Sequence, residues 1–179
     1  KSGAKFDFEK GKWFNHKYLQ EKSDAELAKL FKPILEANGI DTAAFSDNYI
    51  EKAVGMVKGR INFVSDLWTN AAFFFRDPET YDPKAVKKRW SEEMPRIMAE
   101  LTEQLRALKS WKSADAEADI LAWIADKGYH LGNVMNAFRL CVVGECKGPH
   151  MFDITELMGA EKTISRIEKG IREIKLPEA

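Results

Sequence analysis

Apolar side chains recur along this chain at steps of three and four residues, which is the spacing of helices that bury one face. The expected buried positions fall into stripes: Leu27, Leu30, Phe31, Ile34 and Leu35; Ile50, Ala53, Val54 and Val57; Val64, Leu67, Trp68, Ala71, Ala72 and Phe75; Val86, Trp90, Met94, Met98, Leu101 and Leu105; Ile120, Leu121 and Ile124; Leu131, Val134, Met135, Phe138, Cys141 and Val142; and Ile164, Ile167, Ile171 and Ile174. No segment sustains the alternation of a half-buried strand. The pattern predicts an all-α protein of about eight or nine helices.

Helix signals and prolines divide this pattern. Ser23, followed three residues later by Glu26, is typical of a capping box at a helix start, and Ser113 is expected to cap a later helix. Two Asp-Pro steps, at residues 77–78 and 82–83, break the helical pattern because a residue before proline is disfavoured in helical geometry. We therefore expect two consecutive helical domains, residues 1–82 and 83–179. Pro95 should kink or interrupt the long stripe that follows.

Composition narrows the class of protein. With 45% hydrophobic and 31% charged residues, the chain is typical of a soluble globular protein. No apolar run approaches the roughly 20 residues that a membrane-spanning helix needs. Two cysteines are too few for a disulfide scaffold, so a cytoplasmic protein is expected. The chain has no initiator Met and no signal-peptide core, which suggests a fragment or a processed chain.

The charge balance bears on possible partners. The 28 basic and 28 acidic residues cancel, whereas domains that bind nucleic acid without specificity usually carry a basic excess. A local basic face stays possible, because the distribution of charge matters as much as its sum. We expect neither DNA nor a membrane as a partner.

Catalytic and metal-binding motifs are absent from the sequence. It has no Gly-rich phosphate loop, no paired Cys-x-x-Cys and no His-Glu-x-x-His. Cys146 and His150 are four residues apart and could be read as a nucleophile with its base, or as half a metal site. The intervening Gly148-Pro149 prevents a continuous helix from presenting both on one face. We expect no catalytic residue and no metal site.

Two aromatic segments have competing interpretations. The run from Phe73 to Phe75 could stack on bases, but Phe75 continues a buried stripe, so packing is the favoured reading. Trp13 and Phe14 are interpreted first as anchors of the N-terminal segment.

Four stretches, taken together, resemble one family. They are KFDFEKGKWFNHKYL at residues 5–19, MVKGRINFVSDL at 56–67, FFFRDP at 73–78, and KGYHLGNVMNAFRLCVVGECKGPHMFDITELMGAEKTISRI at 127–167. In this order they are similar to the C-terminal, anticodon-binding region of bacterial glutamyl-tRNA synthetases. The similarity runs from about Lys5 to Glu173, almost the whole chain.

The resemblance implies an α-helix cage of two consecutive domains, a monomer, and tRNA-Glu as partner. It implies that the parent enzyme is a glutamate–tRNA ligase using ATP and Mg²⁺ in a catalytic domain that would precede Lys1. No cofactor is then expected in these residues, which would bind tRNA without catalysing a reaction.

The resemblance also points to residues that would contact the anticodon, whose bases are pyrimidines in the family. Pyrimidine carbonyl and ring-nitrogen acceptors require donors, and arginine offers a planar fork of them. Arg60 and Arg139 match family anticodon contacts, although a surface or ion-paired arginine is the usual alternative.

A turn supplies the other matched positions, which are Gly148, Pro149 and Met151. The turn would present backbone groups and a flat Pro or Met surface to a base. Other family members can have Thr at position 148 and Leu at 151, so a contact through a hydroxyl at 148 is not expected here. Phe152 is expected in the core.

Lysines of the N-terminal segment, namely Lys5, Lys10, Lys12 and Lys17, are candidate contacts to the tRNA backbone, with a solvated face as the alternative. A different class of function also stays open at this point, a helical protein-interaction module without tRNA binding, as does a small enzyme using Cys146 and His150.

Overall fold

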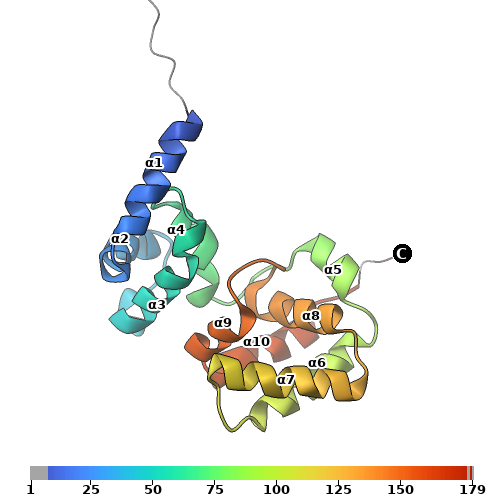
Figure 1. The fold of residues 1–179 in the computed structure, drawn as a ribbon. Coiled ribbons are helices and arrows are strands. Elements are labelled where there is room, and N and C mark those ends of the chain that lie inside the picture. Colours follow the sequence, from blue (N-terminus) through green and yellow to red (C-terminus); the bar gives the residue numbers. More distant parts are fainter. Residues whose placement is uncertain (1–7, 177, 179) are drawn as a thin grey trace, which may run out of the picture. The chain divides into compact units, whose positions relative to one another are not determined.

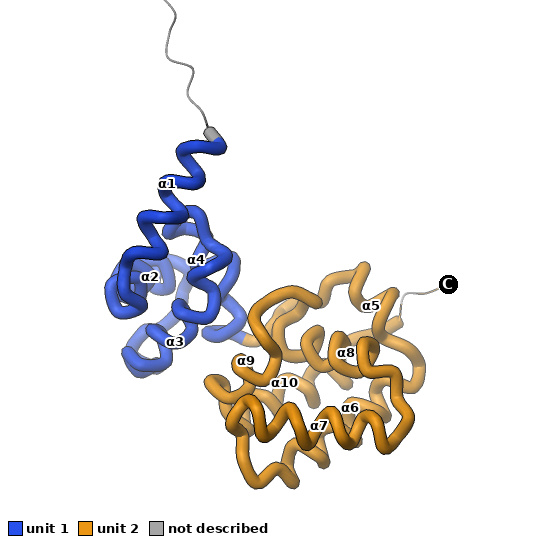
Figure 2. The backbone as a smooth tube through the Cα atoms, in the orientation of Figure 1, with its two compact units in different colours: residues 1–76 blue, residues 77–179 orange. Residues whose placement is uncertain are grey.

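The computed structural model describes residues 8–176 and 178, and within this part the regular structure is entirely helical (Figure 1). The all-α prediction is therefore confirmed for the described residues. The chain divides into two compact units, residues 1–76 and 77–179 (Figure 2). The observed division falls at the first Asp-Pro step, ahead of the expected boundary at residues 82 and 83.

Unit 1 contains four α-helices and three short 3₁₀ turns among its described residues. In chain order they are α1 (Phe8–Glu21), α2 (Asp24–Ala37), η1 (Thr42–Ala44), α3 (Asp47–Val57), η2 (Lys58–Arg60), α4 (Asp66–Ala71) and η3 (Ala72–Phe74). Ser23 is confirmed as the N-cap of α2, since its hydroxyl accepts a bond of 3.1 Å from the amide of Glu26. Helices α2, α3 and α4 pack against one another. Burying one large apolar side chain there contributes about 1.5–3 kcal/mol.

Aromatic residues complete this core. Phe74 and Phe75 are buried, and the ring of Phe75 meets the rings of Phe31, Phe45 and Tyr49 edge-on. The packing interpretation of the Phe run is confirmed at these two positions.

Three tryptophan and phenylalanine positions differ from expectation. Trp13 and Phe14 are 56% and 55% exposed, so their reading as anchors is wrong for the described residues; Leu19, at 2%, anchors α1 instead. Trp68 is only half-buried, and the guanidinium carbon of Arg76 lies 5.0 Å from its ring centroid. A stripe of apolar residues predicts which face of a helix turns inward. Burial of a residue at the edge of that stripe depends on which other parts of the protein cover it.

Unit 2 contains six α-helices among its described residues. They are α5 (Pro83–Arg89), α6 (Met94–Arg106), α7 (Ser113–Lys127), α8 (Leu131–Val143), α9 (Met151–Met158) and α10 (Ala160–Glu173). Helix α10 packs against α6, α8 and α9, while α5 packs on α8 and α7 on α9. The long stripe after residue 83 is interrupted as Pro95 indicated, because the proline lies in the first turn of α6. Ser113 is not a cap, since Lys112 occupies the N-cap position of α7.

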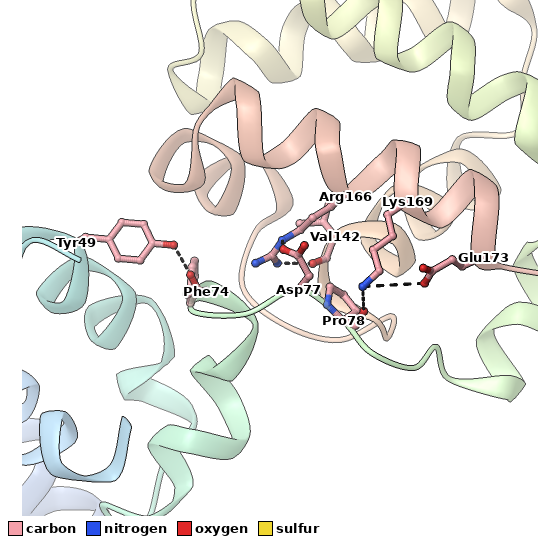
Figure 3. Close-up of polar contacts among 8 residues, drawn as sticks. All are labelled: Tyr49, Phe74, Asp77, Pro78, Val142, Arg166, Lys169 and Glu173. Atoms are coloured by element: carbon pink, nitrogen blue, oxygen red, sulfur yellow. Dashed lines mark hydrogen bonds and ion pairs between the residues drawn. The ribbon is translucent and has the colours of Figure 1, made fainter. Parts of the chain in front are cut away.

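A buried arginine ties the start of unit 2 to its last helix (Figure 3). Arg166 of α10 is 1% exposed; its Nε donates to Asp77 Oδ1 at 2.9 Å and its Nη1 donates to the Val142 carbonyl at 2.7 Å. Lys169 Nζ donates to the Pro78 carbonyl at 2.7 Å. These contacts place residues 77 and 78 within unit 2.

Helices α8 and α10 approach closely at a glycine, and this gives a prediction for stability. A Cβ built at Gly170 would lie 2.6 Å from Cys141 Sγ. Gly170→Ala should therefore lower the free energy of unfolding by about 1–3 kcal/mol through overpacking. Urea denaturation followed by circular dichroism measures it. Gly59→Ala is the matched control, because that Cβ meets nothing within 4 Å. A loss that persists undiminished beside Cys141→Ala would contradict the steric explanation.

Candidate nucleic-acid interface

Arg60 ends the short turn η2, which follows α3 directly. Its side chain is exposed, whereas Ile61, the next residue, is fully buried. Lys58, at the start of the turn, donates from Nζ to the carbonyl of Lys22 and lies 3.6 Å from Asp24 Oδ1. The turn is thus anchored on both sides of an arginine that faces solvent. A fixed backbone limits where the guanidinium of Arg60 can reach, so the predicted contact with a base edge stays compatible with this arrangement.

The structure brings Arg139 and Gly148 together. Arg139 is half-buried on α8, and Gly148 has a φ of 134° in the turn between α8 and α9. A Cβ built on Gly148 would lie 3.2 Å from Arg139 Nη1. The guanidinium therefore lies directly against the position that a Cβ at residue 148 would take. Two residues selected separately from the sequence form one local site.

The other end of this turn is fixed where α8 stops. Gly144 has a φ of 90°, and its carbonyl accepts a bond of 2.9 Å from the amide of Asp82. A Cβ at Gly144 would lie 3.1 Å from the carbonyl oxygen of Thr80. Both the positive φ and the close approach require glycine here.

Pro149 and Met151 differ from their expected arrangement. Both are buried, and Met151 is 2% exposed as the first residue of α9. These side chains do not provide a flat exposed surface, so contact with a base would fall to the backbone of the turn. The exposed side chains of the turn between α8 and α9 are Glu145, Lys147 and His150. Phe152 is buried, as expected.

The N-terminal lysines lie on α1. Lys10 and Lys17 are exposed and Lys12 is half-buried, while Lys5 falls outside the described residues. Lys17 Nζ is 5.5 Å from the ring centroid of Trp13. An exposed helix that carries lysines beside aromatic rings fits a phosphate-rich partner, and contact with the tRNA backbone stays a prediction.

Cys146 and His150 bind different partners. Cys146 Sγ is 3.6 Å from the carbonyl of Asn136, and His150 Nε2 is 2.7 Å from Glu117 Oε2 on α7. Burial raises the pKa of the Cys146 thiol above its ordinary value, whereas an activated nucleophile needs a lowered one. No group of three or more His, Cys, Asp or Glu side chains gathers to hold a metal ion anywhere in residues 8–176 or at 178.

Arg89 belongs to the same region and was missed in the sequence. It lies at the end of α5, is half-buried, and its Nη1 donates to Asn133 Oδ1 on α8 at 3.1 Å. The positive charges of Arg89 and Arg139 both act to lower the pKa of the Cys146 thiol, although burial outweighs them. The basic run Lys87-Lys88-Arg89 was the available signal, but only the packing of α5 on α8 shows that Arg89 faces inward.

A comparison of the sequence with known families decides between the functions that the sequence had left open. The profile described as "Anticodon binding domain" matches residues 26–171, which include parts of both units. The chain belongs to the anticodon-binding domain family. The description of that family favours an anticodon-binding domain over a protein-interaction module without tRNA.

Curated relatives of this anticodon-binding domain are glutamate–tRNA ligases. The ligase of Parabacteroides distasonis is 55% identical over 175 residues, and that of Phocaeicola vulgatus is 51% identical over the same length. Each alignment covers 98% of this chain and 34% of the relative. The chain thus spans about a third of the length of the ligases that it matches.

Solved structures of two ligases share the fold. A glutamate–tRNA ligase from Elizabethkingia meningosepticum, crystallised with its amino acid, matches with a TM-score of 0.87 and 42% identity over 98% of this chain and 34% of that one. The enzyme from Elizabethkingia anophelis matches with a TM-score of 0.81 and 40% identity over 96% of this chain and 33% of that one. This chain therefore has the same all-helical fold as the third of each enzyme that it matches. Across the described residues, no helix is both long and apolar enough to cross a bilayer.

Proposed function

We propose that this chain recognises the anticodon of tRNA-Glu as the C-terminal part of a glutamate–tRNA ligase. The observation that carries the proposal is the match of residues 26–171 to the anticodon-binding domain family. The names of the relatives, all glutamate–tRNA ligases, support the choice of tRNA-Glu. Activation of glutamate with ATP and Mg²⁺ would belong to the part of such a ligase that these residues do not contain. The working state would be a cytoplasmic monomer.

Recognition would use two sets of contacts with different consequences. Arg60 and Arg139, with the backbone of Gly148, Pro149 and Met151, would bind base edges in the unstacked anticodon. Lys10, Lys12 and Lys17 would bind phosphates, which positions the RNA but carries no sequence information. The zero net charge of the chain fits a few specific contacts by arginine and lysine side chains. Nonspecific binding of RNA would need an excess of basic residues.

A titration tests the proposal directly. The 179-residue chain is titrated with tRNA-Glu and with the same tRNA carrying an exchanged anticodon, at low and at moderate salt. We expect tighter binding of tRNA-Glu, by about 1–3 kcal/mol for each base edge that is read. The absolute affinity should be weak, because contacts to the acceptor stem belong to the remainder of the ligase.

Salt dependence separates the two sets of contacts. The preference for the correct anticodon should survive as salt rises, while overall affinity falls by a slope of about 0.7–0.9 per neutralised phosphate on logarithmic axes. Equal affinity for both tRNAs would leave nonspecific adhesion as the explanation. No binding at any modest salt would exclude tRNA recognition by this part of the ligase alone.

A further inference from the structure

Two side chains of α1 hold the backbone on either side of Arg60. His16 Nδ1 lies 2.6 Å from the carbonyl oxygen of Ile61, and Gln20 Nε2 donates to the carbonyl of Lys58 at 2.6 Å. His16 and Gln20 are four residues apart, so they project from the same face of α1 one helical turn apart. Because a carbonyl oxygen only accepts, His16 must carry its proton on Nδ1 to make this bond.

The turn that they hold is weakly closed by its own backbone. Its closing bond, from the amide of Ile61 to the carbonyl of Lys58, is 3.4 Å long. Gly59 contributes no side chain, and a Cβ placed there would meet nothing within 4 Å. The two α1 donors therefore supply short hydrogen bonds at both ends of a turn whose internal bond is long.

The turn η2 in turn holds the segment that follows α1. Lys58 donates from Nζ to the Lys22 carbonyl just beyond the end of α1, and it pairs with Asp24 at 3.6 Å. Leu19 of α1 and Ile61, which follows η2, are both buried. Helix α1 and η2 therefore form one braced piece of backbone, from which the exposed side chain of Arg60 projects.

We propose that His16 and Gln20 are positioning residues for Arg60, fixing the direction from which its guanidinium meets a base of the anticodon. The inference rests on the proposed function of Arg60. Recognition of a base edge tolerates only small displacements of a planar guanidinium, whereas attraction to phosphate tolerates large ones. Loss of the two donors should thus reduce discrimination between bases more than it reduces overall affinity.

The experiment removes the donors while keeping the size of the side chains. His16→Phe with Gln20→Met is compared with the unchanged chain for binding of tRNA-Glu and of tRNAs exchanged singly at each anticodon base. We expect discrimination at the base read by Arg60 to fall about tenfold, the range of one lost base-edge contact. His16→Asn should retain most of the discrimination, because its amide can donate from near the position of Nδ1. Asn15→Ala, at an exposed site on the same helix, is the matched control and should change nothing.

Combination with Arg60→Ala distinguishes positioning from other effects. If the donors act through Arg60, their removal has no further effect on discrimination once Arg60 is gone. An equal further loss in the Arg60→Ala background would overturn the inference, as would full discrimination in the variant lacking both donors. If Arg60→Ala itself leaves discrimination unchanged, the proposed function of Arg60 fails instead. Should the combined variant not fold, Gln20→Met alone is measured in the same cycle.

Discussion

Asp77→Ala should lower the free energy of unfolding by about 3 kcal/mol, near the lower end of the range for breaking a buried ion pair. Arg166 is 1% exposed and its Nε lies 2.9 Å from Asp77 Oδ1, so the substitution removes the carboxylate that faces a buried cation. Guanidinium cannot release its proton at accessible pH, which prevents the protein from relieving the charge by neutralisation. The side chain of Asp77 is 49% exposed, so water can partly replace it and the largest losses are not expected.

A second substitution reveals the origin of this loss. Asp77→Ala combined with Arg166→Met should be more stable than Asp77→Ala alone, since the buried charge is then replaced by an apolar side chain of similar length. Urea denaturation of Asp77→Ala, of Arg166→Met and of the double variant provides the three free energies. Arg106→Ala is the control, because Arg106 also forms ion pairs, with Glu103 and Glu168, but lies on the surface. We expect no measurable loss there. A double variant as unstable as the sum of the single ones would show that packing of Arg166, and not its charge, dominates.

Arg139→Ala should weaken binding of tRNA-Glu by about 1–3 kcal/mol and relax discrimination at one anticodon base. The half-buried guanidinium is confined between α8 and the turn that contains Gly148, where its Nη1 lies 3.2 Å from a Cβ built on that glycine. A confined guanidinium loses little freedom when it binds, so its contribution to discrimination should be large. Fluorescence titration with tRNA-Glu and with each anticodon exchange measures both quantities.

Lysine at the same position tells which kind of contact Arg139 makes. Arg139→Lys keeps the charge but lacks the planar fork, so it should preserve affinity for phosphate and lose discrimination between bases. Arg172→Ala, an exposed arginine at the end of α10, is the matched control and should leave discrimination intact. If Arg139→Ala reduces the affinity for every anticodon equally, the residue binds the backbone of the RNA instead.

Burial of one charged residue shows the limit of periodicity. The last helix was predicted from Ile164, Ile167, Ile171 and Ile174, a pattern that leaves Arg166 on the polar side. Arg166 is instead among the largest fully buried side chains. Its burial depends on Asp77 and on the Val142 carbonyl, which come from distant parts of the sequence. No local pattern contains that information.

Local signals did determine the helices and their breaks. The spacing of apolar residues, the Ser23 cap and Pro95 are each read within a few residues, because helices form through contacts three and four residues apart. Four collinear stretches of sequence indicated the family, and the match of the family profile to residues 26–171 confirms it. Arg60 and Arg139 were also named from the sequence.

Only the tertiary structure decided how those residues are arranged. It placed Arg139 against Gly148, buried the side chain of Met151, left Trp13 exposed, and set His16 and Gln20 beside the turn of Arg60. Each of these outcomes depends on the distance between atoms that are far apart along the chain or on what covers a surface. A sequence fixes local periodicity, whereas burial and side-chain partners arise when the helices pack.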